Sequence, residues 1–152
     1  MNTTNSKQEL LNQCKSYVNQ RLQRIQDTIS DIQESLTSET KSTAGDKHET
    51  GRAMLQLERE KAGQQLAEVQ KLQEILAKID ISSCSEHVRL GSLVATSRGN
   101  YFLSISAGKI LVKNEWYYAI ATNSPIGKLM LGKTIGSEFS FNGGKIKIVK
   151  II

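Results

Sequence analysis

The feature that most constrains this chain is a stripe of apolar residues near its N-terminus, spaced at helical intervals. Successive members are three or four residues apart, close to a heptad repeat, and no glycine or proline interrupts residues 1–44. Glutamines and charged residues fill the positions between them. The stripe consists of Leu11, Cys14, Val18, Leu22, Ile25, Ile29, Ile32 and Leu36. The pattern predicts a long helix that packs along one narrow face against another helix.

A second stripe with helical spacing follows, and it supplies that partner. It consists of Leu55, Ala62, Leu66, Val69, Leu72, Leu76 and Ile79, and Gly63 interrupts it at a cost of about 1 kcal/mol relative to alanine. Residues 37–45 are rich in Ser, Thr and Gly, which predicts a turn. Because the connection is short, the two helices are expected to pack antiparallel, as a hairpin about 45 Å long. We call residues 37–50, at its far end, the tip.

After residue 83 the pattern changes to the alternation of strands. The stretches V-R-L-G-S-L-V-A-T, Y-F-L-S-I-S and E-W-Y-Y-A-I-A-T predict three strands, and S-E-F-S-F with K-I-K-I-V-K-I-I predicts a hairpin around N-G-G. Pro125 after Ser124 predicts a short capped helix. The fold class is therefore predicted as α+β. Residues 1–83 form an antiparallel coiled-coil hairpin, and residues 84–152 form a small antiparallel sheet domain of four or five strands.

Charge and aromatic residues divide the chain at the same place. Residues 1–83 contain 11 basic and 12 acidic side chains, whereas residues 84–152 contain nine and three. Tyr17 is the one aromatic residue among the first 100, so a core built on aromatic residues is expected in the C-terminal part only. The basic C-terminal part suits nucleic acid or an acidic protein surface, and ordinary solubility explains it equally well.

The sequence also predicts the compartment. We find no apolar N-terminal run typical of a secretory signal and no apolar stretch of 18 residues that would span a membrane. Cys14 and Cys84 lie far apart in sequence and in different predicted elements, and we interpret both as free thiols in a reducing compartment. A soluble cytoplasmic protein is expected.

Two carboxylates, Asp46 and Glu49, stand three residues apart at the tip, in A-G-D-K-H-E-T-G. In a structural interpretation, Asp46 caps the second helix and Glu49 reaches back to it, with both charges favoured by the helix dipole. In a functional one, the pair binds a hard divalent cation, whose remaining ligands come from a partner. The two are compatible, since a capping carboxylate keeps a free oxygen. His48 between them is either exposed without a role or contacts phosphate or water.

Several stretches resemble one known family. Residues 123–138, N-S-P-I-G-K-L-M-L-G-K-T-I-G-S-E, resemble the S-P-x-x-x-x-L-x-G-K-x-x-G-D-E signature of the Gre transcript cleavage factors. The tail F-S-F-N-G-G-K-I-K-I-V-K-I-I resembles their last hairpin, and A-G-D-K-H-E-T-G resembles their G-D-x-x-E-N-A tip. V-R-L-G-S-L-V resembles the start of their C-terminal domain. The resemblance covers essentially the whole chain.

The resemblance implies a concrete function. Gre factors join an antiparallel coiled coil to a C-terminal domain similar to FKBP-type prolyl isomerases in fold only. By resemblance, the loop of Asn123, Ser124 and Pro125 would dock this chain at the secondary channel of bacterial RNA polymerase. Asp46 and Glu49 would reach the polymerase active site, help hold its second Mg²⁺ and orient the water that cuts the 3′ end of backtracked RNA.

The resemblance also implies what the chain is not. It would not be an enzyme alone, because it would stimulate the nuclease activity of the polymerase. No tightly bound cofactor is expected, since the Mg²⁺ would be shared with the polymerase. Its partners would be the polymerase and the nascent RNA 3′ end, with no membrane and no small-molecule substrate.

Departures from the family pattern favour a second hypothesis. Thr50 stands where the family usually has asparagine, and Ser137 stands where an aspartate is expected. Both tip acids remain. These departures are compatible with a Gre-like regulator that binds the channel and inhibits polymerase without stimulating cleavage.

A third hypothesis comes from a different class, a coiled-coil protein whose basic C-terminal domain binds nucleic acid. Tyr101 and Phe102 would stack on bases, although alternation in a strand makes at least one of them part of the core. Binding would fall steeply with salt and need no polymerase. The basic residues expected to carry it are Lys145, Lys147, Lys150 and Arg98.

Overall fold

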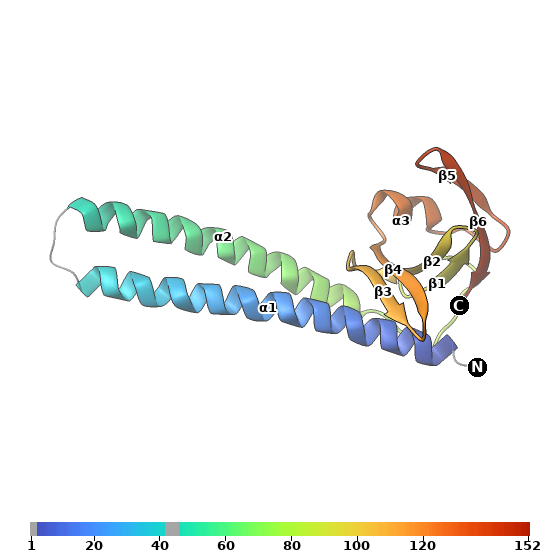
Figure 1. Ribbon diagram of the computed structural model, residues 1–152, viewed down its shortest axis with the longest axis horizontal. Helices are drawn as coiled ribbons and strands as arrows, with labels where there is room; N and C mark the ends of the chain where they lie inside the picture. The colour runs from blue at the N-terminus through green and yellow to red at the C-terminus, as the bar shows by residue number, and fades with distance from the viewer. Residues whose placement is uncertain (1–2, 42–45) are drawn as a thin grey trace. The chain divides into compact units, whose positions relative to one another are not determined.

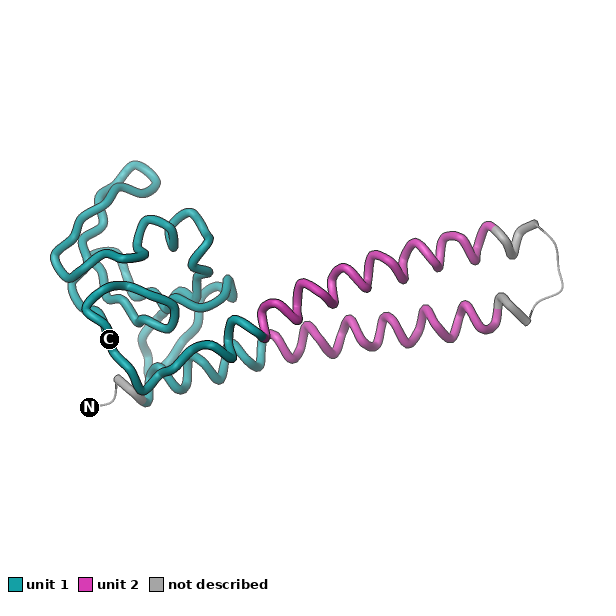
Figure 2. Tube along the Cα trace, turned by 180° about the vertical axis from the view of Figure 1, so that it is seen from behind, with its two compact units in different colours: residues 1–17, 74–152 teal, residues 18–73 magenta. Residues whose placement is uncertain are grey.

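The structure is a computed structural model that describes residues 3–41 and 46–152, with side chains for residues 5–38 and 50–152. The chain divides into two compact units, shown in different colours in Figure 2. Residues Val18–Gln73 form the hairpin unit, and Met1–Tyr17 with Glu74–Ile152 form the sheet unit. The domain boundary expected after residue 83 rests on composition rather than packing, and it stays a prediction.

The hairpin unit consists of two antiparallel helices. Helix α1 (Thr3–Lys41) and helix α2 (Asp46–Ala77) run side by side in opposite directions (Figure 1). The predicted stripes face inward in this unit: Val18, Ile25, Ile32, Ala62 and Val69 are buried, and Leu22, Ile29, Leu36, Leu55, Leu66 and Leu72 are half-buried. The predicted helical hairpin is thus confirmed, because the heptad-like spacing keeps one face of each helix against the other.

Helix α1 extends further than the sequence predicts. Residues 37–41, expected to belong to the turn, are helical. Thr37 donates its hydroxyl proton to the carbonyl oxygen of Gln33 at 3.0 Å. A hydroxyl that bonds to the carbonyl four residues earlier is compatible with helix, whereas the prediction assumed that it would compete.

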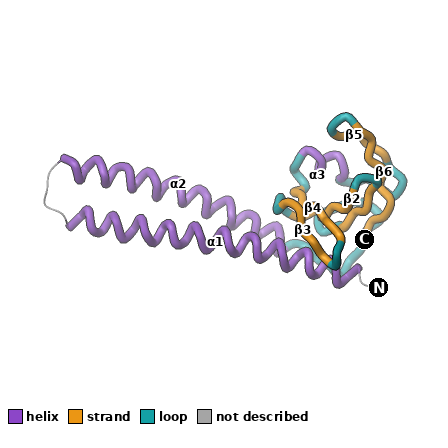
Figure 3. The backbone as a smooth tube through the Cα atoms, viewed as in Figure 1, coloured by secondary structure: helices purple, strands orange, loops and turns teal. Residues whose placement is uncertain are grey.

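The sheet unit contains six strands in the order β3-β4-β2-β1-β6-β5, drawn in orange in Figure 3. The α+β class, with the helices first and the sheet after them, is confirmed. The expected antiparallel sheet of four or five strands is corrected in two respects: the sheet has six strands, and it is mixed because β2 pairs with β4 in parallel. The strands are β1 (Leu93–Thr96), β2 (Gly99–Ser104), β3 (Gly108–Val112), β4 (Glu115–Ala121), β5 (Glu138–Phe141) and β6 (Gly144–Ile151).

Strand β3 is the element that the sequence analysis missed. It forms a hairpin with β4 through Lys113 and Asn114, whose φ angles are 51° and 66°. Two successive positive φ values define the two-residue turn that suits the twist of a hairpin. The signal was present as K-I-L-V followed by K-N. Strand β4 folds back antiparallel to β3 and therefore runs in the same direction as β2.

The two faces of the sheet are covered by different helices. Helix α3 (Pro125–Met130) contributes to the core on one face. On the other face, the start of α1 packs against the sheet: Cys14 Sγ lies 3.7 Å from Ser104 Oγ, and Gln13 donates to the Leu111 carbonyl oxygen at 3.5 Å. Cys14 is buried and Cys84 exposed, and both are free. The core on the α3 face consists of Val88, Val94, Leu103, Ile126, Met130, Phe139, Ile146 and Ile148.

Lys7 is the unexpected member of the α1 contact. Its side chain is only 2% exposed, and its Nζ donates to the main-chain carbonyl oxygen of Ile152 at 3.0 Å. Burial lowers the pKa of the Lys7 ammonium, and Arg89 adds to this, while Cys84 and Asp80 oppose it. The folded protein therefore binds this proton less tightly than the unfolded chain does, and the charged form costs stability.

We expect Lys7→Met to leave the free energy of unfolding at pH 7 unchanged or to raise it by about 1–3 kcal/mol. The Ile152 carbonyl oxygen keeps the N–H of Leu93 as a donor at 3.0 Å, so the substitution orphans no buried acceptor. The cost of the charge is fully present below the lowered pKa and is relieved as pH rises through it. Thermal unfolding should accordingly show the variant's advantage shrinking as the pH rises toward 10.5, the ordinary pKa of a lysine. A variant less stable than the wild type at pH 7 would show that the ammonium stabilises the contact.

Candidate functional site

The loop between β4 and α3 contains the predicted docking residues Asn123, Ser124 and Pro125. Ser124 is the N-cap of α3: its Oγ accepts the N–H of Gly127 at 3.1 Å and donates to the carbonyl oxygen of Ala121 at 2.6 Å. Pro125 is the first helical residue, where its fixed φ and missing N–H are tolerated. The predicted short capped helix is thus confirmed.

Gly127 fits the helix closely against the end of β4. A Cβ at this position would overlap the Ala121 carbonyl oxygen and come within 3.0 Å of the Thr122 carbonyl oxygen. Both obstacles are backbone atoms, which cannot rotate away as a side chain would. Glycine is therefore needed here for close approach, and this keeps the loop and α3 in one fixed arrangement.

The loop and the segment after α3 expose a mixture of polar and apolar groups. Asn123 and Pro125 are exposed, whereas Ser124 is half-buried with its hydroxyl engaged in the cap. Leu129, Leu131 and Ile135 add exposed apolar surface, with Ile135 60% exposed. Asn123 and Pro125 are thus available for contact, and a role in docking for all three loop residues stays a prediction.

The remainder of the resembling stretch forms a turn tied to both neighbouring segments. Gly132 and Gly136 have φ angles of 79° and 90°, which glycine adopts without strain. Their N–H groups donate to the carbonyl oxygens of Val88 and Ile148 at 2.8 Å each. Ser137, at the expected aspartate, uses its Oγ to accept the N–H of Thr134 at 3.1 Å. The serine thus supplies the side-chain oxygen that closes this turn.

The tip is only partly within the described residues. Helix α2 begins at Asp46, and Glu49 lies in its first turn. The side chains of Asp46, His48 and Glu49 lie outside the described residues, so both the capping and the metal interpretation remain predictions. Elsewhere, in the part of the chain that the structure describes, we find no group of three or more His, Cys, Asp or Glu residues that could hold a metal ion.

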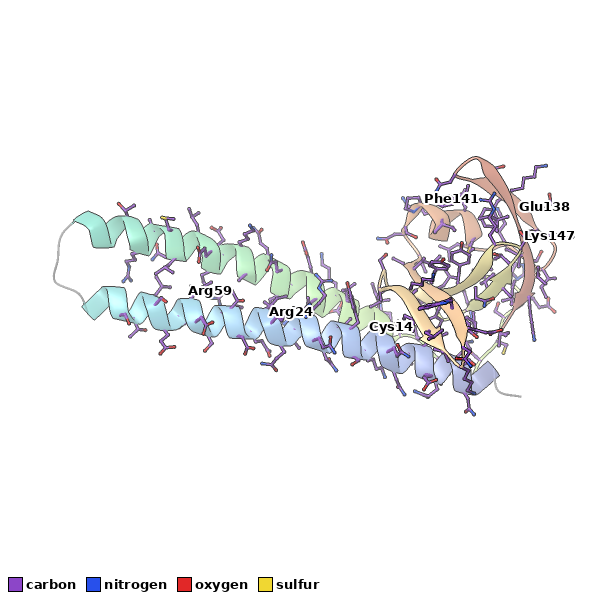
Figure 4. The ribbon with its side chains drawn as sticks, in the orientation of Figure 1. Cys14, Arg24, Arg59, Glu138, Phe141 and Lys147 are labelled. Atoms are coloured by element: carbon purple, nitrogen blue, oxygen red, sulfur yellow. The ribbon has the colours of Figure 1, made fainter. Side chains whose placement is uncertain are left out.

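The basic residues of the nucleic-acid hypothesis do not come together. Ile146 and Ile148 face the α3 core, so Lys145 and Lys147 point to the opposite face of β6. Lys147 lies opposite Glu138 in the β5–β6 ladder (Figure 4). Phe102 is fully buried and cannot stack on a base.

Lys150 instead lines an open cavity of about 360 Å³ in the sheet unit. Glu115 accepts the hydroxyl of Tyr117 there at 2.9 Å, and burial, with a smaller contribution from Glu115, raises the pKa of Tyr117. The Tyr117 hydroxyl and the Glu115 carboxylate satisfy each other by this hydrogen bond. The cavity lining thus contains both the Lys150 ammonium and the Glu115 carboxylate. Its lining is Ser6, Leu93, Ala95, Asn100, Glu115, Tyr117, Lys150 and Ile152.

Sequence reasoning missed one surface feature. Trp116 and Tyr118, expected to belong to an aromatic core, are exposed on β4, whereas Tyr117 between them is buried. The alternation in E-W-Y-Y-A-I-A signalled that these residues point to different faces, but it did not tell which face is covered.

No family model matches the sequence. No curated protein matches it either. Among solved structures, the chain is similar to that of the transcription factor Gfh1, with 18% identity over 93% of this chain and 92% of that chain, and a TM-score of 0.35. Among the helices of the part of the chain that the structure describes, none contains an apolar stretch that could span a bilayer.

Proposed function

We propose that this chain is a Gre-type transcription elongation factor of the bacterial cytoplasm, which binds RNA polymerase at its secondary channel and stimulates cleavage of backtracked RNA. The observation that carries the proposal is the resemblance of residues 123–138 to the Gre signature. This stretch extends over α3, the turn after it and the first residue of β5. Ser124 caps its helix, Gly127 allows the close approach to β4, and Gly132 and Gly136 occupy positions that favour glycine.

The helical hairpin supports the same proposal. The parts of α1 and α2 within the hairpin unit are each about 40 Å long at 1.5 Å per residue, and α2 begins at the first tip acid. A pair of helices is a slender element, suited to a narrow channel. In this proposal the sheet unit remains at the channel entrance, where Asn123, Ser124 and Pro125 contact the polymerase.

The chemistry of Asp46 and Glu49 suits the role in holding Mg²⁺ that the resemblance implies for them. Carboxylate oxygens are hard ligands of the kind that Mg²⁺ prefers, and two of them leave most of an octahedral shell to the polymerase and to water. With a second Mg²⁺ held by these carboxylates, the polymerase site would supply the two-metal chemistry of phosphodiester hydrolysis. A carboxylate of the tip also accepts a hydrogen bond from the attacking water and orients it. The chain thus completes a site of its partner and has no catalytic activity alone.

The experiment that tests this proposal combines binding and cleavage. The chain should be retained by immobilised RNA polymerase from the same cell and should shorten the RNA in stalled, backtracked complexes. Asn123→Ala should weaken retention about fivefold or more, whereas Asn12→Ala, at an exposed position on α1, should leave it unchanged. Equal retention of both variants would remove the loop from the interface, and no retention of the wild type would overturn the proposal.

One observation favours a second function on the same partner. Thr50, in place of the family's usual asparagine, directly follows the tip glutamate. A factor with an altered tip would enter the channel and obstruct it. In that case the wild-type chain would slow nucleotide addition by polymerase without shortening transcripts, and the same assay distinguishes the two outcomes.

A further inference from the structure

Strands β2, β3 and β4 carry a group of aromatic and basic side chains that has no role in the proposed function, and all of its members except the half-buried Tyr101 are exposed. Trp116 is 49% exposed and Tyr118 is 37% exposed. They lie two residues apart on β4 and therefore project from the same face. Lys109 on β3 and Tyr101 on β2 flank Tyr118 in the strand register. We call these four residues, Trp116, Tyr118, Tyr101 and Lys109, the aromatic surface.

The side chains of the aromatic surface are ordered by one another. The rings of Tyr101 and Tyr118 are stacked, with centroids 5.5 Å apart and planes at 28°. Lys109 Nζ lies 4.5 Å from the centroid of the Trp116 ring and 6.0 Å from that of Tyr118, as in cation–π contacts. The exposed rings are thus arranged before any ligand arrives, which lowers the entropy lost on binding.

The charge on this face is positive. The one acidic residue in strands β2, β3 and β4 is Glu115, which alternates with Trp116 and bonds to Tyr117 instead. The guanidinium of Arg98, in the turn between β1 and β2, occupies the space that a Cβ at Gly144 on β6 would fill. Burial raises the pKa of Tyr101, and Arg98 opposes this effect. Lys109 and Arg98 therefore flank the rings, and no carboxylate of these strands shares their face.

We propose that the aromatic surface binds single-stranded nucleic acid, with bases stacked on Trp116 and Tyr118 and phosphates paired with Lys109 and Arg98. Exposed aromatic rings beside cationic side chains are the combination that holds single strands without reading their sequence. A duplex hides the faces of its bases, so it cannot use the rings. An acidic protein surface would match the cations but would leave the ring faces without a partner of their own kind.

This inference goes beyond the proposed function, because it needs no polymerase. It also differs from the nucleic-acid site expected from sequence, since Lys145, Lys147 and Lys150 lie outside the aromatic surface. Of the residues in that hypothesis, Arg98 and Tyr101 remain.

Trp116 is the only tryptophan of the chain, so its fluorescence reports directly on the aromatic surface. The full chain should be titrated with 12-nucleotide oligo(U) and oligo(dT), following tryptophan emission together with the anisotropy of a labelled strand. We expect saturable quenching and an affinity that falls with salt. Tyr118→Ala should weaken binding about tenfold, and Tyr118→Phe, which keeps the ring, should retain most of it.

Lys109→Gln and Lys145→Gln provide a matched pair, since both remove one exposed positive charge. Lys109→Gln should weaken binding and reduce the slope of log affinity against log salt by about 0.7, whereas Lys145→Gln should not. The proposal is overturned if the two variants behave alike, if strands bind without changing Trp116 emission, or if a blunt duplex or poly-glutamate binds as tightly. None of these outcomes bears on polymerase binding, so the two proposals fail separately.

Discussion

Asp46→Asn and Glu49→Gln are each expected to lower the rate of stimulated RNA cleavage about a hundredfold or more, while affinity for polymerase stays within about twofold. Each change keeps the size of the side chain and removes its negative charge, so the ligand for a divalent cation and the acceptor for the attacking water are both weakened. The measurement is the shortening of labelled RNA in stalled complexes. Raising the Mg²⁺ concentration should restore part of the lost rate, because weaker binding is offset by mass action.

The choice of asparagine at position 46 separates the two interpretations of the tip. Asparagine caps helices about as well as aspartate does, so Asp46→Asn should leave α2 intact. Glu58→Gln, at an exposed position on α2, serves as the control for a lost negative charge and should stimulate cleavage by the polymerase as the wild type does. If both tip variants stimulate cleavage as well as the wild type does, Asp46 and Glu49 serve only to cap α2.

Gly127→Ala is expected to destabilise the sheet unit by about 2–3 kcal/mol, a large fraction of the stability of a small protein. The new Cβ would overlap the carbonyl oxygen of Ala121, and relief requires α3 to move away from β4. Such a shift would break the bond between the Gly127 N–H and Ser124 Oγ and loosen the packing of Ile126 and Met130 in the core. Urea unfolding followed by Trp116 fluorescence measures the change.

Lys128→Ala is the matched control for this prediction. Lys128 is the next residue along the chain and is exposed, so its substitution should change the free energy of unfolding by less than about 0.5 kcal/mol. If the docking loop depends on the position of α3, Gly127→Ala should also weaken retention by polymerase more than Lys128→Ala does. Equal unfolding midpoints for the two variants would mean that the loop adjusts to a methyl group without cost.

Elements whose signals are local could be predicted from the sequence. The spacing of Leu22, Ile25 and Ile29 suffices to define a helix face, because a helix repeats every 3.6 residues whatever lies around it. Ser124 before Pro125 likewise predicted the cap of α3, since the residues that satisfy a helix end are its neighbours in the chain. The turn at Asn142 and Gly143, with φ angles of 51° and 77°, follows from residues that tolerate positive φ.

Which face of each strand is covered, and by which helix, depends on tertiary packing that no local pattern encodes. Alternation predicts that Tyr117 points to one face of β4 and that Trp116 and Tyr118 point to the other. Tyr117 is buried and its two neighbours are exposed, because α1 and α3 cover different parts of the sheet. The parallel pairing of β2 with β4 and the burial of Lys7 against Ile152 join residues far apart in sequence. Such contacts depend on the order of strands in the sheet, which the period of a local pattern does not encode.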